Sequence, residues 1–221
     1  STYYLLTLLA QPISASLGLS LEFVSAGMSI LLVLSSLLGP TVGRLMDVNG
    51  AQPVMMTGSA VTAAGLVALA FVSGPARYLA AWLILGVAAS MTLYPAAFTA
   101  LTQIVPDQAR RAITLLTLPG GLASTVFWPL TKALLDVTDW RSIALIYAGL
   151  NLCICLPIHA LVIPPGGTRL RPQSNPTNGP EGLPPEARRK AFVLFAAMLA
   201  LNSLLVTGIL NQFMTFMTGL G

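Results

Sequence analysis

The sequence predicts an all-α membrane protein, and three observations support that fold class. Hydrophobic residues make up 55% of the 221 positions and charged residues only 8%, which leaves too few charges to cover a water-soluble surface of this size. The mean hydropathy is +0.81. The apolar residues fall into runs of about 20, the length that an α-helix needs to cross the hydrocarbon core of a bilayer. The lipid bilayer is therefore the expected partner of most of the chain.

Seven such runs account for most of the chain. The first, residues 1–17, has neither the charged flank nor the cleavage site of a signal peptide, and we expect it to be a truncated transmembrane helix. The other runs cover residues 21–45, 54–73, 78–104, 112–137, 142–163 and 191–217. They predict a six-helix transmembrane bundle over residues 1–163 and a seventh helix within residues 191–221.

Residues 164–190 interrupt this apolar pattern. They contain seven of the 16 prolines and five of the 11 basic residues of the chain. Such a segment cannot form a buried core and is typical of a flexible connection between two bundles. Six helices, a basic linker and a further helix are the layout of one half of a six-plus-six protein, followed by the start of the other half.

The positions of Lys and Arg predict the orientation, because short basic loops stay in the cytoplasm. When alternate loops are assigned to opposite sides, eight basic residues fall on one side and three on the other. We therefore expect the N-terminus and the 164–190 linker to be cytoplasmic, in a multi-pass protein of the inner (plasma) membrane. The net charge of +4 follows these loops and forms no single basic face, so no nucleic-acid partner is expected.

Residues 39–52 (GPTVGRLMDVNGAQ) are expected to form a tight cytoplasmic turn between the second and third helices. Gly43, Asp47 and Gly50 match the G-x-x-x-D-(R/K)-x-G-(R/K) signature of the major facilitator superfamily, which the chain also resembles in layout. Val48 and Ala51 stand at the two basic positions of that signature. A charge relay through these two positions is therefore not expected.

This resemblance implies half of a twelve-helix facilitator fold and rocker-switch alternating access for a small organic solute. Arg110-Arg111-Ala112 and Asp139-Trp140-Arg141 are similar to helix starts in the monocarboxylate and oxalate/formate branches, which implies a carboxylate as the solute. The arginine that some drug exporters carry in the fourth helix is absent, because Trp82 stands four residues before Gly86. Symport or antiport with a proton or another ion, and efflux in place of uptake, stay open alternatives.

The signature residues predict a gate at the cytoplasmic membrane face. Glycines allow close helix approach, and the Asp47 carboxylate can accept backbone N–H groups or meet a basic partner. Arg110 and Arg111 are the candidate partners. The alternatives are that Gly43, Asp47 and Gly50 only form a loop and that the two arginines only anchor the topology.

Polar side chains within the spans are candidates for a solute site near the bilayer midplane, because such groups are costly to leave in lipid. Helical spacing places Tyr4, Thr7 and Gln11 on one face of the first helix. The full candidate set is Tyr4, Thr7, Gln11, Ser90, Tyr94, Thr125, Trp128, Thr207 and Asn211. Ser and Thr often bond only carbonyls of their own helix, so Gln11, Tyr94 and Asn211 are the strongest candidates.

The sequence offers no nucleophile with a base, no metal-ligand cluster and no phosphate-binding glycine loop, so neither an enzyme nor a cofactor is expected. Cys153 and Cys155 lie in an apolar run and are interpreted as packing residues. A membrane sensor or scaffold without transport activity is the alternative to a transporter. Such a protein would carry a soluble signalling domain, whereas a transporter would carry five further spans.

Overall fold

The computed structural model describes residues 2–164 together with residues 190, 194 and 198. The chain divides into two compact units, Ser1–Pro172 and Gln173–Gly221. The helical bundle belongs to the first unit. The predicted seventh helix and nearly all of the 164–190 linker lie outside the described residues.

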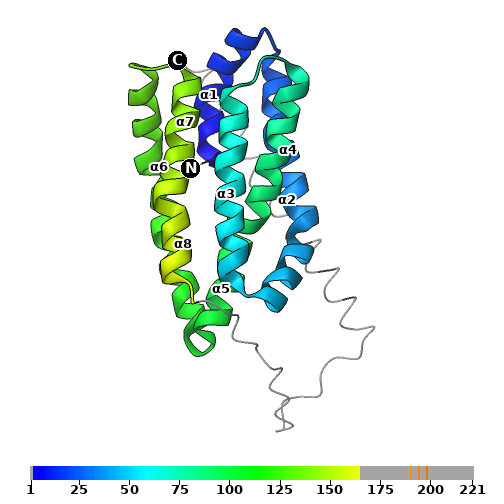
Figure 1. The fold of residues 1–221 in the computed structure, drawn as a ribbon, viewed down its shortest axis with the longest axis vertical. Helices are drawn as coiled ribbons and strands as arrows, with labels where there is room; N and C mark the ends of the chain where they lie inside the picture. The colour runs from blue at the N-terminus through cyan, green and yellow to red at the C-terminus, as the bar shows by residue number, and fades with distance from the viewer. Residues whose placement is uncertain (1, 165–189, 191–193, 195–197, 199–221) are drawn as a thin grey trace. The chain divides into compact units, whose positions relative to one another are not determined.

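The described part of the first unit is helical throughout (Figure 1). Its elements are α1 (Thr2–Leu17), α2 (Leu21–Asn49), α3 (Ala51–Ala70), α4 (Pro75–Thr92), α5 (Tyr94–Ile104), the 3-10 turn η1 (Pro106–Gln108), α6 (Ala109–Leu135), α7 (Trp140–Leu150), the π-helical turn η2 (Asn151–Cys155) and α8 (Leu156–Val162). Five helical segments among the described residues are long and apolar enough to cross a bilayer, and α1 adds a shorter apolar helix. The all-α membrane fold class is confirmed, while the count of six plus one spans stays a prediction.

Prolines divide several of these helices. Pro95 has no N–H to donate to the carbonyl four residues earlier, and its ring would clash with that carbonyl, so the fourth predicted span is split at Leu93 into α4 and α5. Pro40 lies inside α2, and Pro157 is the second residue of α8, which follows the π-helical turn. The helix α3 has no proline beyond its first turn and runs through the bundle without a break.

Two hydrophobic clusters form the core of the described bundle. We name the two ends of the bundle after their turns: the Gly74 end, which also holds the turn at Gly18, and the Gly50 end, which also holds η1. The larger cluster extends to the Gly74 end and centres on Tyr78, Trp82 and Ile143. The smaller cluster lies toward the Gly50 end and consists of Val42, Met46, Ala51, Val54, Met55, Ala96, Ala100 and Ile163. Pro40, inside the continuous helix α2, and the break at Leu93 between α4 and α5 lie between the two clusters.

Glycines bring α4 close to its neighbours α2 and α3. A Cβ atom at Gly27 would lie 2.6 Å from Trp82 Nε1, and one at Gly65 would lie 2.7 Å from Leu85 Cδ2. Small residues at such contacts let membrane helices pack closely where no hydrophobic driving force exists between them. The indole ring of Trp82 therefore fills the space beside Gly27.

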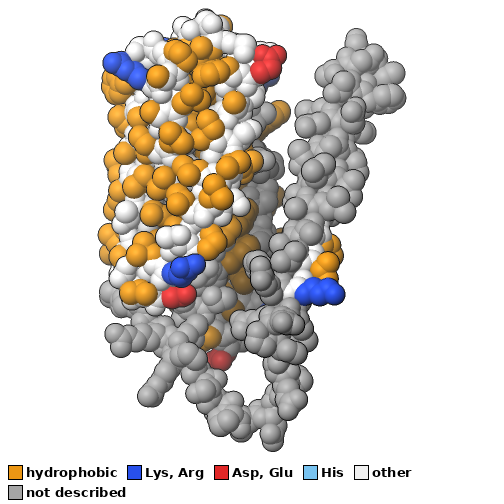
Figure 2. All heavy atoms as spheres, turned by 90° about the vertical axis from the view of Figure 1, so that its right-hand side faces the viewer, with side chains coloured by type: hydrophobic (Ala, Val, Ile, Leu, Met, Phe, Trp, Pro, Cys, Tyr) orange, Lys and Arg blue, Asp and Glu red, His pale blue; other side chains and the backbone are white. Residues whose placement is uncertain are grey.

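The surface follows the pattern of a membrane protein. On the face shown in Figure 2, hydrophobic side chains cover the middle of the described bundle, and the charged side chains lie near its two ends. Leu37 is 70% exposed, and many other large apolar side chains are at least one-third exposed. Lipid-facing helices need such an apolar band, which a water-soluble protein would hide.

The turn that the sequence predicted over residues 39–52 is much shorter in the structure. Helix α2 continues to Asn49 and α3 begins at Ala51, so Gly50 alone separates them. Gly50 has φ 87° and ψ 162°, a conformation open to glycine and strained for other residues, and its N–H bonds to the Met46 carbonyl at 2.8 Å. Gly39, Gly43 and Asp47 are thus helical residues, because a glycine inside an apolar membrane helix does not by itself end it.

Candidate functional site

Asp47 and Gln103 meet at the Gly50 end. Asp47 lies on the last turn of α2 and Gln103 on the last turn of α5, and Gln103 Nε2 donates a hydrogen bond of 3.2 Å to Asp47 Oδ1. The Asp47 side chain is exposed, whereas Gln103 is only 6% exposed. Among the described residues Asp47 forms no ion pair, and the Gln103 amide oxygen is buried without a hydrogen-bond partner. This pair is the best-defined polar contact at the predicted gate.

A second pair of polar contacts joins α3 to α8 near the same end. Gln52 Nε2 donates to the Ala160 carbonyl at 2.6 Å, and Ser59 Oγ lies 2.8 Å from His159 Nδ1. These bonds connect residues that are 108 and 100 positions apart in sequence. They hold the last helical segment of the described bundle against the unbroken α3.

Arg110 and Arg111 lie in the first turn of α6, as predicted for the start of the fifth span. Both are exposed and line an open hollow of about 510 Å³ together with residues of η1, including Asp107. The hydrogen bond that the structure gives to the Asp47 side chain comes from Gln103 and not from either arginine. The predicted pairing of Asp47 with these arginines therefore stays a prediction.

Gly43 of the signature and Gly39, four residues before it, face open space. A Cβ atom at Gly39 or at Gly43 would meet nothing within 4 Å in the described bundle. No neighbouring helix of the described bundle therefore uses the space beside these two glycines. Contacts with another part of the protein stay a prediction.

The predicted solute-site residues fall into different surroundings. Gln11 on α1 and Thr125 on α6 are exposed and have no hydrogen-bond partner among the described residues. Tyr94 and Trp128 are each 46% exposed. Ser90 is buried and donates to the Val87 carbonyl of its own helix at 2.6 Å, which is the bonding that serines in helices commonly adopt.

Tyr94 contacts α6 closely. A Cβ atom at Gly120 would collide with the Tyr94 hydroxyl, so only glycine leaves room for this ring. Of the other candidates, Tyr4 and Thr7 belong to α1, and Thr207 and Asn211 lie outside the described residues. The structure thus brings Tyr94 to α6, and the convergence of the whole set on one cavity stays a prediction.

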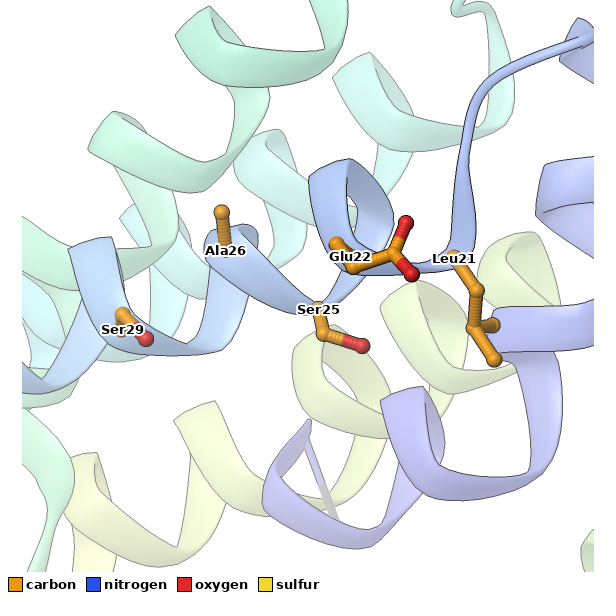
Figure 3. Close-up of a pocket in the computed structure, with 5 residues that line it drawn as sticks. All are labelled: Leu21, Glu22, Ser25, Ala26 and Ser29. Carbon is orange, nitrogen blue, oxygen red and sulfur yellow. The ribbon is translucent and has the colours of Figure 1, made fainter.

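A hollow beside the start of α2 was not predicted from the sequence. Leu21, Glu22, Ser25, Ala26 and Ser29 line about 480 Å³ along one side of the helix (Figure 3). Ser25 and Ser29 are exposed, and their hydroxyls have no partner within the described part of the chain. The i, i+3 and i+4 spacing of these residues is readable in the sequence, but they lie near the end of a span, whereas the predicted solute site is near the bilayer midplane.

Comparison with known proteins decides the family. The sequence profile described as Major Facilitator Superfamily matches residues 1–221. The chain belongs to this family. A protein from Thermoproteus tenax described as "Uncharacterized 38 kDa protein in 23S RNA operon" is 30% identical over 164 residues. The match covers 74% of this chain and 43% of that relative, so the chain spans less than half of the relative's length.

Membership in the Major Facilitator Superfamily and the apolar helices together make the chain part of a multi-pass membrane protein. The apolar spans and the family together indicate that lipid surrounds the bundle.

Proposed function

We propose that the protein is a secondary active or facilitative transporter that carries a small organic solute across the membrane by alternating access. The match of the family profile to the whole chain is the observation that carries this proposal. The bundle of residues 1–163 is one half of the transporter, the 164–190 segment is a linker, and residues 191–221 begin the other half. Solute would pass between the halves while they rock about a central site.

The Gly50 end is the cytoplasmic end in this proposal. Among the described residues of the bundle, Arg44, Arg110 and Arg111 lie at the Gly50 end and Arg77, Lys132 and Arg141 at the Gly74 end. The eight-to-three asymmetry therefore depends on the five basic residues of the 164–190 segment. Local structure accounts for two cations at the Gly74 end, because Arg77 bonds to Ser73 and Arg141 bonds to Ser16 and to the Val72 carbonyl.

The gate of this transporter is the Gly50 end of α2, with Gly43, Asp47 and Gly50 as its signature residues. The exposed Asp47 carboxylate, held by Gln103, is available to a partner on the cytoplasmic side. Arg110 and Arg111 act as topology anchors beside it, because they line the separate hollow at η1.

The substrate class follows from two features of the chain. The helix starts at Arg110 and Asp139 resemble those of carboxylate carriers and make monocarboxylates the first class to assay. The Glu22 carboxylate in the hollow at the start of α2 makes organic cations the second class, because opposite charge favours their entry.

Solute flux in proteoliposomes tests the function. The full-length protein is reconstituted, and saturable uptake of radiolabelled acetate, lactate and oxalate is compared with that of choline and with protein-free vesicles. Preloaded vesicles measure efflux in the same preparation, and imposed proton or sodium gradients test symport and antiport. A folded protein that moves none of these solutes in either direction would favour the sensor or scaffold alternative.

A further inference from the structure

We propose that Gln103 is the positioning residue for the Asp47 carboxylate and that their bond joins the Gly50-end segments of α2 and α5 into one gating element. This inference rests on the proposed gate role of Asp47. It adds a residue outside the family signature, on a different helix and 56 positions further along the chain.

The chemistry of the two groups fixes how they meet. An ionised carboxylate can only accept hydrogen bonds, so the amide NH₂ of Gln103 has to face Asp47 and the amide oxygen has to face away. The Nε2 to Oδ1 distance of 3.2 Å is at the long end of the normal range. Because Gln103 is only 6% exposed, its amide moves less freely than a surface side chain and restricts the carboxylate to one direction.

The buried amide oxygen shows that packing alone does not explain a glutamine at this position. Gln103 Oε1 has no hydrogen-bond partner within the described residues. A buried polar atom without a partner costs stability, and an apolar side chain of similar size would avoid that cost. The amide is therefore best explained by the bond that its other end makes to Asp47.

The position of the bond gives it a mechanical consequence. Pro40 interrupts the hydrogen bonding of α2, and the Leu93–Pro95 break separates α5 from α4. Beyond these breaks Val42 and Met46 of α2 belong to the same small core as Ala96 and Ala100 of α5. The Gln103–Asp47 bond joins α5 to α2 beside this small core. A movement of α5 therefore carries the Asp47 carboxylate with it.

Thiol labelling tests the inference without a known substrate. In the full-length protein with Cys153 and Cys155 replaced by serine, a single reporter cysteine is placed at Ser29, in the hollow at the start of α2. A membrane-impermeant maleimide is added from outside intact cells. A weakened gate at the Gly50 end favours the conformation that is closed at the Gly74 end, so Asp47→Ala should slow labelling by roughly fivefold or more.

Gln103→Met, which keeps the size of the side chain and removes the amide, should slow labelling in the same direction. In the Asp47→Ala background Gln103→Met should have no further effect, because Gln103 acts only through Asp47. The matched control is Gln52→Met, which removes a similar amide-to-carbonyl bond at the same end. It should lower the thermal midpoint and leave the labelling rate unchanged.

Three outcomes would overturn the inference. Labelling of Gln103→Met at the parent rate would show that Gln103 does not act on the gate. Equal slowing by Gln103→Met with and without Asp47 would show a structural role. No response to Asp47→Ala would remove the gate role of Asp47 and the inference with it, while flux in proteoliposomes still decides the transport function separately.

Discussion

Gly27 illustrates how one residue sets the distance between two helices. Its missing side chain lets the Trp82 ring of α4 lie directly against α2, and the Trp82 side chain is fully buried there. The Tyr78 hydroxyl of the same helix donates to the Val24 carbonyl at 2.6 Å and fixes the register one turn away. The contact between α2 and α4 thus depends on a glycine, two aromatic rings and one hydrogen bond.

Gly27→Ala should destabilise the protein, because the added Cβ atom would lie 2.6 Å from Trp82 Nε1 and the buried ring cannot move away. Overpacking of this kind costs about 1–3 kcal/mol, more than the helix propensity of about 1 kcal/mol that alanine gains over glycine. Gly39→Ala on the same helix is the matched control, because nothing in the described bundle lies within 4 Å of the new atom. Thermal unfolding in detergent should show a lower midpoint for the first variant and an equal or higher one for the second.

A substitution at Gln11 can distinguish a role in the solute pathway from a role in helix packing. Its side chain is exposed and has no partner within the described bundle, so water or solute can satisfy it. Gln11→Leu should therefore weaken solute affinity in the reconstituted protein and leave the thermal midpoint nearly unchanged. A loss of about 1 kcal/mol in stability with normal affinity would instead identify Gln11 as an interhelical contact and remove it from the candidate solute site.

At the scale of the elements, the sequence was informative about helices and less so about their ends. Runs of apolar residues predicted the five long apolar helical segments and the shorter helix α1 that the structure describes, and Pro95 marks the break between α4 and α5. The turn was misplaced because Gly39, Gly43 and Asp47 are typical turn residues, and a single sequence cannot show that lipid keeps such residues helical until Gly50. At the start of α7 the sequence Asp139-Trp140-Arg141 indicated only a family resemblance, although each of these residues has a structural role.

These residues at the start of α7 connect the helices that meet at the Gly74 end. The Asp139 carboxylate accepts from the Ser142 hydroxyl at 2.5 Å and from the Ser142 N–H at 3.1 Å, which caps α7. Trp140 is buried, and the Arg141 guanidinium lies 4.3 Å from the centre of its ring. Arg141 also bonds to Ser16 at the end of α1 and to the Val72 carbonyl beyond α3.

The Asp139 cap should make stability depend on pH. Its two bonds from Ser142, first the hydroxyl and then the N–H, hold the pKa of the carboxyl below its usual value. The ionised form therefore stabilises the fold, so the contribution is complete above the unfolded pKa of about 4 and is lost as the pH falls through the lower folded pKa. Ser142→Ala removes the larger of the two causes and should shift this loss to higher pH. Thermal midpoints measured across this range, with Asp139→Ala as the variant that lacks the effect, check the shift.

At the scale of the whole molecule, the described bundle is two cores joined by interrupted helices. The all-α membrane fold was predictable because lipid imposes long apolar spans. The pairing of Asp47 with Gln103 was not predictable, because it depends on how α2 and α5 meet beyond two proline breaks. The hollow at Glu22 was missed for a related reason: its polar residues become a group only when helix α2 presents them on one open side.

The orientation of the bundle is a property of the whole molecule that labelling can decide. If the Gly50 end is cytoplasmic, cysteines at Ser174 and Asn178, in a background without Cys153 and Cys155, should resist a membrane-impermeant thiol reagent in intact cells. The described bundle offers one control at each end: Gln108 of η1 should be protected in the same way, whereas Ala76 at the start of α4 should react promptly, since both side chains are exposed. Permeabilised cells should label all four positions. Prompt reaction at Ser174, Asn178 and Gln108 with protection at Ala76 would reverse the orientation, and the Asp47–Gln103 pair would then lie at the external face.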